Sequence, residues 1–195
     1  MKKFIAWIMA LTCLIGLAGC NQNEETQPTD TTSNTETINQ EISKPESYEF
    51  EAQYVRTDGS AWERSSPYCI VIDSKEELEA YYAANKEQFD LERKETALGF
   101  LDACDKYNDA YFENNNLILI VLQEGSGSTR HEITDVRAHQ DEYGTGWDIT
   151  INRILAEMGT CDMAQWHLFL EMQSDVIQES DPIWINGELC EIIDN

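Results

Sequence analysis

The alternation of apolar and polar positions predicts a folded region that begins near residue 48. Apolar and polar residues alternate over most of 48–56, which indicates a half-buried strand. The run Pro67–Ile72 is short and β-branched, and it predicts a second strand. Ser74 and Glu77 then form a capping box, and the spacing of the next apolar residues predicts an amphipathic helix over 75–89.

A second helix is predicted over 96–113, where apolar side chains again recur at near-helical spacing. The three asparagines at 114–116 end this helix. The run 117–122 (LILIVL) is apolar without alternation, which is typical of a central strand that is covered on both faces. Further strands are predicted over 129–138 and 147–152, on either side of a turn.

The last third of the chain leaves two interpretations open. Residues 164–172 continue the strand pattern, although apolar residues over 154–172 also fit a helical period. Gly159-Thr160 favours a break, and 182–193 is β-like around Asn186-Gly187. Because strands and helices do not alternate regularly, the predicted fold class is α+β. We expect a mainly antiparallel sheet of about five to seven strands with two helices packed on it.

The first twenty residues predict export and lipid attachment. Lys2 and Lys3 precede an apolar run, 4–18, that is shorter than the roughly 20 residues of a membrane-spanning helix and fits a signal peptide. The run ends in Leu17-Ala18-Gly19-Cys20, which resembles the lipobox of bacterial lipoproteins. This resemblance implies that 1–19 is removed and that acyl chains on Cys20 anchor the protein to the extracytoplasmic face of the cell membrane. The alternative is an ordinary secretory signal with a chance cysteine.

Between the signal and the first strand, residues 20–47 predict a tether. The segment consists mainly of Thr, Asn, Gln and Glu and has no aromatic residue, so it cannot bury enough apolar surface to offset the entropy of ordering. As a disordered spacer it would reach about 30 Å. The remaining residues, 48–195, form the single globular domain that we expect.

The charge of the chain restricts its partners. The 195 residues include 37 acidic against 13 basic residues, which gives a formal net charge of −24. This excess excludes nucleic acid, because phosphate binding needs a basic surface. It also disfavours electrostatic docking on anionic lipid, so we expect acylation rather than charge to hold the protein at the membrane.

Four segments together resemble a group of uncharacterised lipoproteins from clostridia-like Firmicutes. They are EAQYVRTDG (51–59), IDSKEELEAYY (72–82), YFENNNLILIVLQEGSGSTRHEI (111–133) and MGTCDMAQWHLFLEM (158–172). More distantly, the order of helix, strand, Gly-rich turn and further strands is similar to the C-terminal domain family of the protease-complex subunit PrcB. This likeness implies a role as an accessory to a surface protease, and neither resemblance implies a reaction or a catalytic residue.

The turn Gly125-Ser126-Gly127-Ser128 is the first candidate binding element. A β-like run follows it, so it lacks the helix N-terminus that a phosphate-binding loop needs. It is either a flexible hairpin or a loop that contacts a ligand or a protein partner. The neighbouring basic residues would favour an anionic group, and Trp62 in a polar loop would add an exposed contact unless it packs back on the sheet. The candidate binding residues are Trp62, Ser126, Gly127, Ser128, Arg130 and His131.

A catalytic alternative rests on Asp162, His167 and Glu171. On a strand, His167 and Glu171 share a face, and such a pair with a bound water or nucleophile would suit a hydrolase or a metal-dependent enzyme. No nucleophile is evident, and none of the three histidines has metal-ligand spacing. We therefore predict no cofactor and no metal, and polar residues on a solvated strand face are the simpler interpretation.

The cysteines of the expected domain could form a disulfide. Cys13 would leave with the signal and Cys20 would carry lipid, so four remain in the domain. An exported location permits disulfides, and four cysteines allow three connectivities. We expect Cys104 to pair with Cys161, because a loop at Cys161 could fold over the helix that carries Cys104. Free buried thiols are the alternative.

The sequence thus predicts a membrane-anchored surface lipoprotein with one non-catalytic domain. Its expected role is to bind a protein or another ligand at the cell surface.

Overall fold

The computed structural model describes residues 47–58, 67–93, 98–141, 144–178 and 180–193. Within them, nine strands form two mostly antiparallel sheets that are accompanied by three helices, so the predicted α+β class is confirmed. The predicted signal peptide and lipidated cysteine lie outside the described residues, as does the predicted tether except for its last residue.

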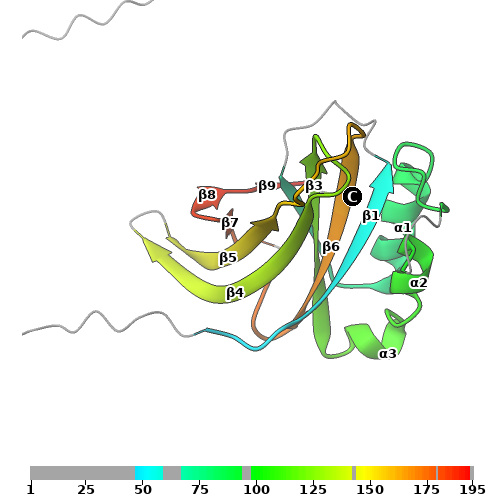
Figure 1. The fold of residues 1–195 in the computed structure, drawn as a ribbon. Helices are drawn as coiled ribbons and strands as arrows, with labels where there is room; N and C mark the ends of the chain where they lie inside the picture. The colour runs from blue at the N-terminus through cyan, green and yellow to red at the C-terminus, as the bar shows by residue number, and fades with distance from the viewer. Residues whose placement is uncertain (1–46, 59–66, 94–97, 142–143, 179, 194–195) are drawn as a thin grey trace, which may run out of the picture. The chain divides into compact units, whose positions relative to one another are not determined.

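The larger sheet has five strands in the order β1-β6-β3-β2-β9 (Figure 1). Neighbouring strands run antiparallel except for the pair β2–β9, which is parallel. The strands are β1 (Glu51–Asp58), β2 (Tyr68–Ile72), β3 (Asn115–Glu124), β6 (Ala164–Gln173) and β9 (Glu191–Ile192).

Strand β3 lies at the centre of this sheet, as its continuous apolar run predicts. Because successive side chains point to opposite faces, Leu117 and Leu119 pack toward the helices, whereas Ile118 and Ile120 pack toward the second sheet. Both faces are therefore buried, and the domain has two apolar cores separated by one sheet.

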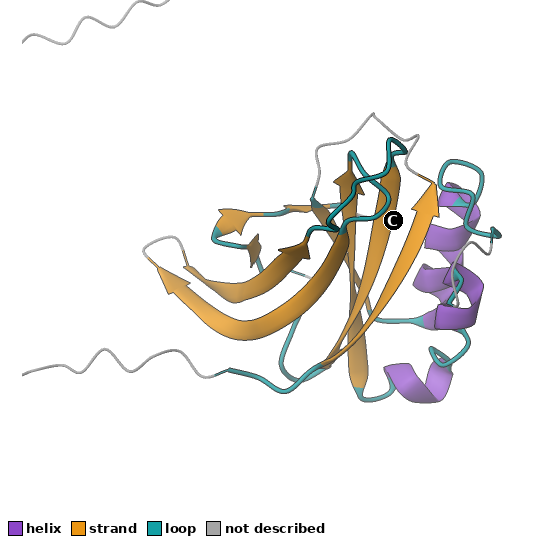
Figure 2. Ribbon diagram, viewed as in Figure 1, coloured by secondary structure: helices purple, strands orange, loops and turns teal. Residues whose placement is uncertain are grey.

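The three helices cover only the outer face of the five-stranded sheet (Figure 2). Helix α1 (Lys75–Asn85) begins at Ser74, whose Oγ accepts a hydrogen bond from the backbone N–H of Glu77 at 3.3 Å. The predicted second helix is instead two short ones, α2 (Phe100–Cys104) and α3 (Asp109–Phe112).

The division of that helix has a local cause. The side chain of Asn108 accepts a hydrogen bond from the backbone N–H of Tyr111 at 3.1 Å and so caps α3 as a new helix. The preceding residue, Tyr107, is turned into the core and is almost fully buried.

The second sheet has four strands in the order β4-β5-β7-β8. They are β4 (Arg130–Asp141), β5 (Gly144–Ile154), β7 (Ile183–Ile185) and β8 (Glu188–Leu189). The predicted β structure around Asn186-Gly187 is confirmed, because both residues have positive φ and form the two-residue turn between β7 and β8. A helix over 154–172 is wrong, since 164–173 forms β6, which lies between β1 and β3 in the larger sheet.

Gly146 is the glycine whose replacement we expect to destabilise the fold most. A Cβ there would collide with the carbonyl oxygen of Pro182 and lie 2.7 Å from the ring of Trp184, where β5 pairs with β7. Gly146→Ala is therefore expected to lower the free energy of unfolding by about 2 kcal/mol or more in urea titrations. Gly125→Ala is the matched control, because its Cβ would meet no atom within 4 Å. Equal unfolding midpoints for the two variants would contradict this packing.

Candidate functional site

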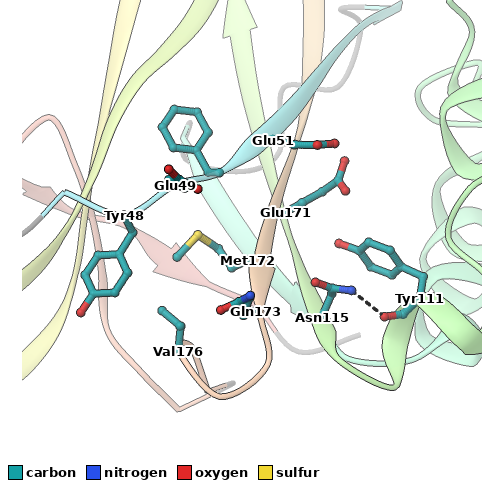
Figure 3. Close-up of a pocket in the computed structure, with 10 residues that line it drawn as sticks. Tyr48, Glu49, Glu51, Tyr111, Asn115, Glu171, Met172, Gln173 and Val176 are labelled. Carbon is teal, nitrogen blue, oxygen red and sulfur yellow. Dashed lines mark hydrogen bonds between the residues drawn. The ribbon is translucent and has the colours of Figure 1, made fainter.

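A cleft of about 810 Å³ opens where the start of β1 crosses the end of β6 and the start of β3 (Figure 3). Three carboxylates line it, from Glu49, Glu51 and Glu171. Its other lining side chains are aromatic, amide or apolar, and they include Tyr48 and Tyr111. A concave surface that combines apolar area with a few convergent polar groups is the usual form of a ligand site.

Strand register places the charged residues of the cleft. Glu51 and Glu171 are Cα partners in the antiparallel β1–β6 pair, so their side chains extend from the same face of the sheet. Figure 3 shows both carboxylates directed to the same side of the cleft. On the other flank, β3 and β6 pair Asn115 with Gln173, and Asn115 Nδ2 donates to the carbonyl oxygen of Tyr111 at 2.9 Å.

One cation partly offsets these acids. The ammonium of Lys106 forms an ion pair with Glu171 and lies 3.9 Å from Glu51 Oε2. The hydroxyl of Tyr107 also donates to Glu171 Oε1 at 3.2 Å, and Gln53 Nε2 donates to that hydroxyl at 2.8 Å. Glu171 is thereby fixed with 13% of its side chain exposed, whereas the Glu51 side chain is 82% exposed.

Burial and the nearby carboxylates raise the pKa values of two tyrosines, Tyr111 in the cleft and Tyr107 behind it. Burial raises the pKa of Tyr111, and the charges of Glu171 and Glu51 raise it further. Burial is also the main reason that the pKa of Tyr107 is raised, and Glu171 adds to it. Both phenols therefore remain protonated at neutral pH. The cleft offers carboxylates that can accept hydrogen bonds from a cation and aromatic faces on which an aliphatic stem can lie.

The polar groups of the Gly-Ser turn, 125–128, form hydrogen bonds with other residues of the protein. Thr160 and Ser128 exchange hydrogen bonds, with the backbone N–H of each donating to the side-chain oxygen of the other at 3.1 and 3.2 Å. Ser126 Oγ lies 2.9 Å from Ser128 Oγ, and the N–H of Gly127 donates to the carbonyl of Asp162. These contacts fasten the turn to the segment between β5 and β6. A Cβ at Gly127 would meet the ends of the Arg56 and Asp162 side chains, which would have to move aside.

Arg130 and His131 follow the turn but lie on opposite faces of β4. Arg130 is exposed, and His131 is buried with its Nε2 3.1 Å from Glu124 Oε1. Arg153 donates two hydrogen bonds of 2.7 Å to the same carboxylate. Burial lowers the pKa of His131, against the opposing effect of Glu124. His131 thus contacts an acid of the protein itself, and the two basic residues do not form one anion site.

The three residues of the catalytic alternative are not brought together. His167 is 0% exposed and contacts Thr57 and Tyr81, and Asp162 is exposed in an ion pair with Arg56. Glu171 does share a face with His167, as predicted, but that face packs against the helices and is not solvated. The expectation of a solvated strand face is therefore wrong.

The remaining predicted site residues are Trp62 and the cysteine pair Cys104 and Cys161. Trp62 lies outside the described residues. Cys104 in α2 and Cys161, exposed between β5 and β6, are both free thiols. The expected pairing is not found, because the segment that carries Cys161 packs on the Gly-Ser turn and α2 packs on β1.

The part of the chain that the structure describes has neither a membrane-spanning helix nor a cluster of metal ligands. There, no helix has the length and apolar character needed to span a bilayer. In the same ranges, no three His, Cys, Asp or Glu side chains gather in a way that could hold a metal ion.

Sequence reasoning singled out Glu171 but missed the rest of the cleft. Nothing in the spacing of residues 48–51 links them with 171–176, and only the pairing of β1 with β6 makes them neighbours. The one available signal was that acids occupy two successive polar positions of the alternation, Glu49 and Glu51.

Comparison of the chain with models of protein families, with curated proteins and with solved structures found no match.

Proposed function

We propose that the protein is a non-catalytic binding module of the cell surface, and that its acidic cleft holds a Lys- or Arg-bearing segment of a partner protein. The single observation that carries this proposal is the cleft itself, in which Glu51 and Glu171 extend from one face on the side of Tyr111, with Tyr48 across the cleft (Figure 3).

A basic peptide fits the chemistry of this cleft better than other ligands do. Glu51 is largely exposed and its ion pair with Lys106 is long, at 3.9 Å, so an arriving ammonium or guanidinium group can reach its carboxylate. The aliphatic stem of a lysine or arginine can lie along Tyr48, Phe50 or Met172. An acidic or phosphorylated ligand would meet three carboxylates and would be repelled. The acidity of the whole chain would also speed the approach of a basic partner.

We also propose that a lipid anchor on Cys20 holds this module at the membrane. Acyl chains on Cys20 would hold the chain at the membrane, and the segment 20–47 would lead into Tyr48 at the edge of the cleft. An accessory role beside a surface protease is compatible with this position, since such a module would need only to hold its partner. Labelling of cells with a radioactive fatty acid tests the anchor separately, because a chain without lipid on Cys20 stays unlabelled.

A titration with labelled peptides tests the binding function. The full chain, kept in mild detergent, is titrated with three peptides of equal length that are basic, neutral and acidic. We expect saturable binding of the basic peptide alone, and we expect the affinity to fall as salt is raised because the contacts are between exposed charges. Equal affinity for all three peptides, or no saturable binding of the basic one, would contradict the proposal.

A further inference from the structure

Two buried cysteines, far apart in the sequence, meet at the edge of the larger sheet. Cys69 lies in β2, and Cys190 lies between β8 and β9. Their Sγ atoms are 2.7 Å apart, although 121 positions of the chain separate them. Cys69 is 0% and Cys190 is 6% exposed, so both belong to the core between the two sheets.

The backbone holds the two residues in register. Strand β9 pairs with β2 in parallel, so that Cys69 is the Cα partner of Ile192, and the N–H of Ile193 donates to the carbonyl of Cys69 at 3.0 Å. On its other side, the N–H of Cys190 donates to the carbonyl of Ile183 in the second sheet at 2.7 Å. Cys190 is thus the point at which the C-terminal segment passes from one sheet to the other.

We propose that Cys69 and Cys190 form a disulfide in the exported protein. Such a bond joins the C-terminal segment covalently to the larger sheet and ties the two sheets together at this edge. The inference rests on the proposed export of the protein, concerns the stability of the fold and does not depend on what the cleft binds. Cys104 and Cys161 are expected to remain thiols, since Cys104 lies in α2 and Cys161 is exposed on the segment that packs on the Gly-Ser turn.

The oxidation needs an acceptor for two electrons, and we assign that role to the disulfide of an extracytoplasmic thiol oxidoreductase. The thiolate of one cysteine attacks that disulfide and forms a mixed disulfide, from which the second cysteine releases the enzyme as a dithiol. One sulfur–sulfur bond is formed and one is broken, and the two thiol protons end on the reduced enzyme.

The order of events follows from the burial of the site. In the folded chain, burial raises the pKa of Cys69, and contact with Cys190 raises it further, so the reactive thiolate is scarce. Oxidation is therefore expected before the C-terminal segment has finally docked. Once formed, the bond would be shielded from soluble reductants by the core around it.

Peptide mapping tests the bond directly. Cells that produce the full chain are treated with an alkylating agent to trap free thiols, and the protein is digested without reductant. We expect one cross-linked species that contains Cys69 and Cys190, lighter by two hydrogen atoms than the sum of its peptides, together with alkylated Cys104 and Cys161. Alkylated Cys69 and Cys190, or a bond of either to another cysteine, would overturn the proposal.

Thermal unfolding gives a second readout. Reduction is expected to lower the Tm of the parent by on the order of 10 °C, because the loop between the two cysteines is long. The double variant Cys69→Ala with Cys190→Ala should show no shift on reduction. The matched control, Cys104→Ala with Cys161→Ala, should shift like the parent. A parent whose Tm is unchanged by full reduction would refute the bond.

Discussion

Acidification from pH 7 to pH 4.5 is expected to lower the free energy of unfolding by about 2.5 kcal/mol through His167 alone. Burial lowers the pKa of this histidine to about 3, whereas the ordinary value is 6.5. Below pH 6.5, His167 therefore binds a proton in the unfolded chain but stays neutral in the folded chain. The stability that the neutral imidazole contributes is fully present above pH 6.5 and is lost as the pH falls toward 3.

The surroundings of His167 explain why it stays neutral. One ring nitrogen hydrogen bonds to Thr57 Oγ1 at 3.1 Å and the other to the hydroxyl of Tyr81 at 2.8 Å. Phe89 and Phe100 pack on the ring with centroids 5.1 and 5.3 Å away. A neutral imidazole suits both hydrogen bonds, since one nitrogen donates and the other accepts. No carboxylate contacts the ring within the described residues, so a charged form would be desolvated without compensation.

Urea titrations at the two pH values measure the effect. The variant His167→Gln keeps polar atoms on the side chain but cannot take up this proton, so its stability should fall less between pH 7 and pH 4.5 than that of the parent. His139→Gln is the control, because His139 is only half-buried and stacks on Trp184, and this variant should retain the acid sensitivity of the parent. Equal acid sensitivity of His167→Gln and the parent would contradict this explanation.

Charge reversal in the cleft is expected to weaken binding of a basic peptide by roughly tenfold or more. The variant replaces Glu49 and Glu51 by lysine, which turns two attractive charges into repulsive ones. Both side chains are exposed, so the substitutions should leave the thermal unfolding curve nearly unchanged. Fluorescence anisotropy of the labelled peptide measures the change in Kd.

The matched control reverses two acids elsewhere. Glu157→Lys with Glu188→Lys makes the same change in net charge, but neither residue lines the cleft. Its effect on the Kd should be small and should vanish at high salt, because only the long-range field is altered. If both double variants weaken binding equally, net charge rather than the cleft determines the affinity.

The features that local patterns predict are those with a local cause. The continuous apolar run of β3 predicts burial on both faces, and Asn186-Gly187 predicts a tight turn, because each depends on a few adjacent residues. Pairing does not follow from such patterns. The strand periodicities are as compatible with one sheet as with two, and only tertiary contacts place β4 and β5 in a sheet of their own.

Two local features depart from simple periodicity, and the first of them made the prediction of one helix over 96–113 wrong. The capping of α3 by Asn108 divided a helix whose apolar spacing looked continuous. In β4, Ile133 and Val136 are three positions apart, yet both face the core, because a bulge between 133 and 135 inserts an extra residue. Neither effect has a signature in the alternation of apolar and polar residues.

The candidate site could be foreseen only in part for a related reason. The sequence singles out Glu171 because it is close to His167 along the chain. In the structure, its neighbours are Glu51, Lys106 and Tyr107. They come from a strand and from the segment between two helices that lie far from Glu171 in the chain. The Gly-Ser turn was noticed as a flexible element, and in the folded chain its polar groups are bonded to the segment at Thr160.

The central claim is that the acidic cleft binds a basic segment, and amide NMR spectra of isotope-labelled protein test it most directly. On titration with the basic peptide, the shifts should be confined to 48–51, 111–115 and 171–176, where the cleft residues lie. Shifts centred instead on the apolar groove between α1 and α2, lined by Leu78 and Leu101, would contradict the claim. Spectra that do not change at a saturating concentration of peptide would contradict it equally.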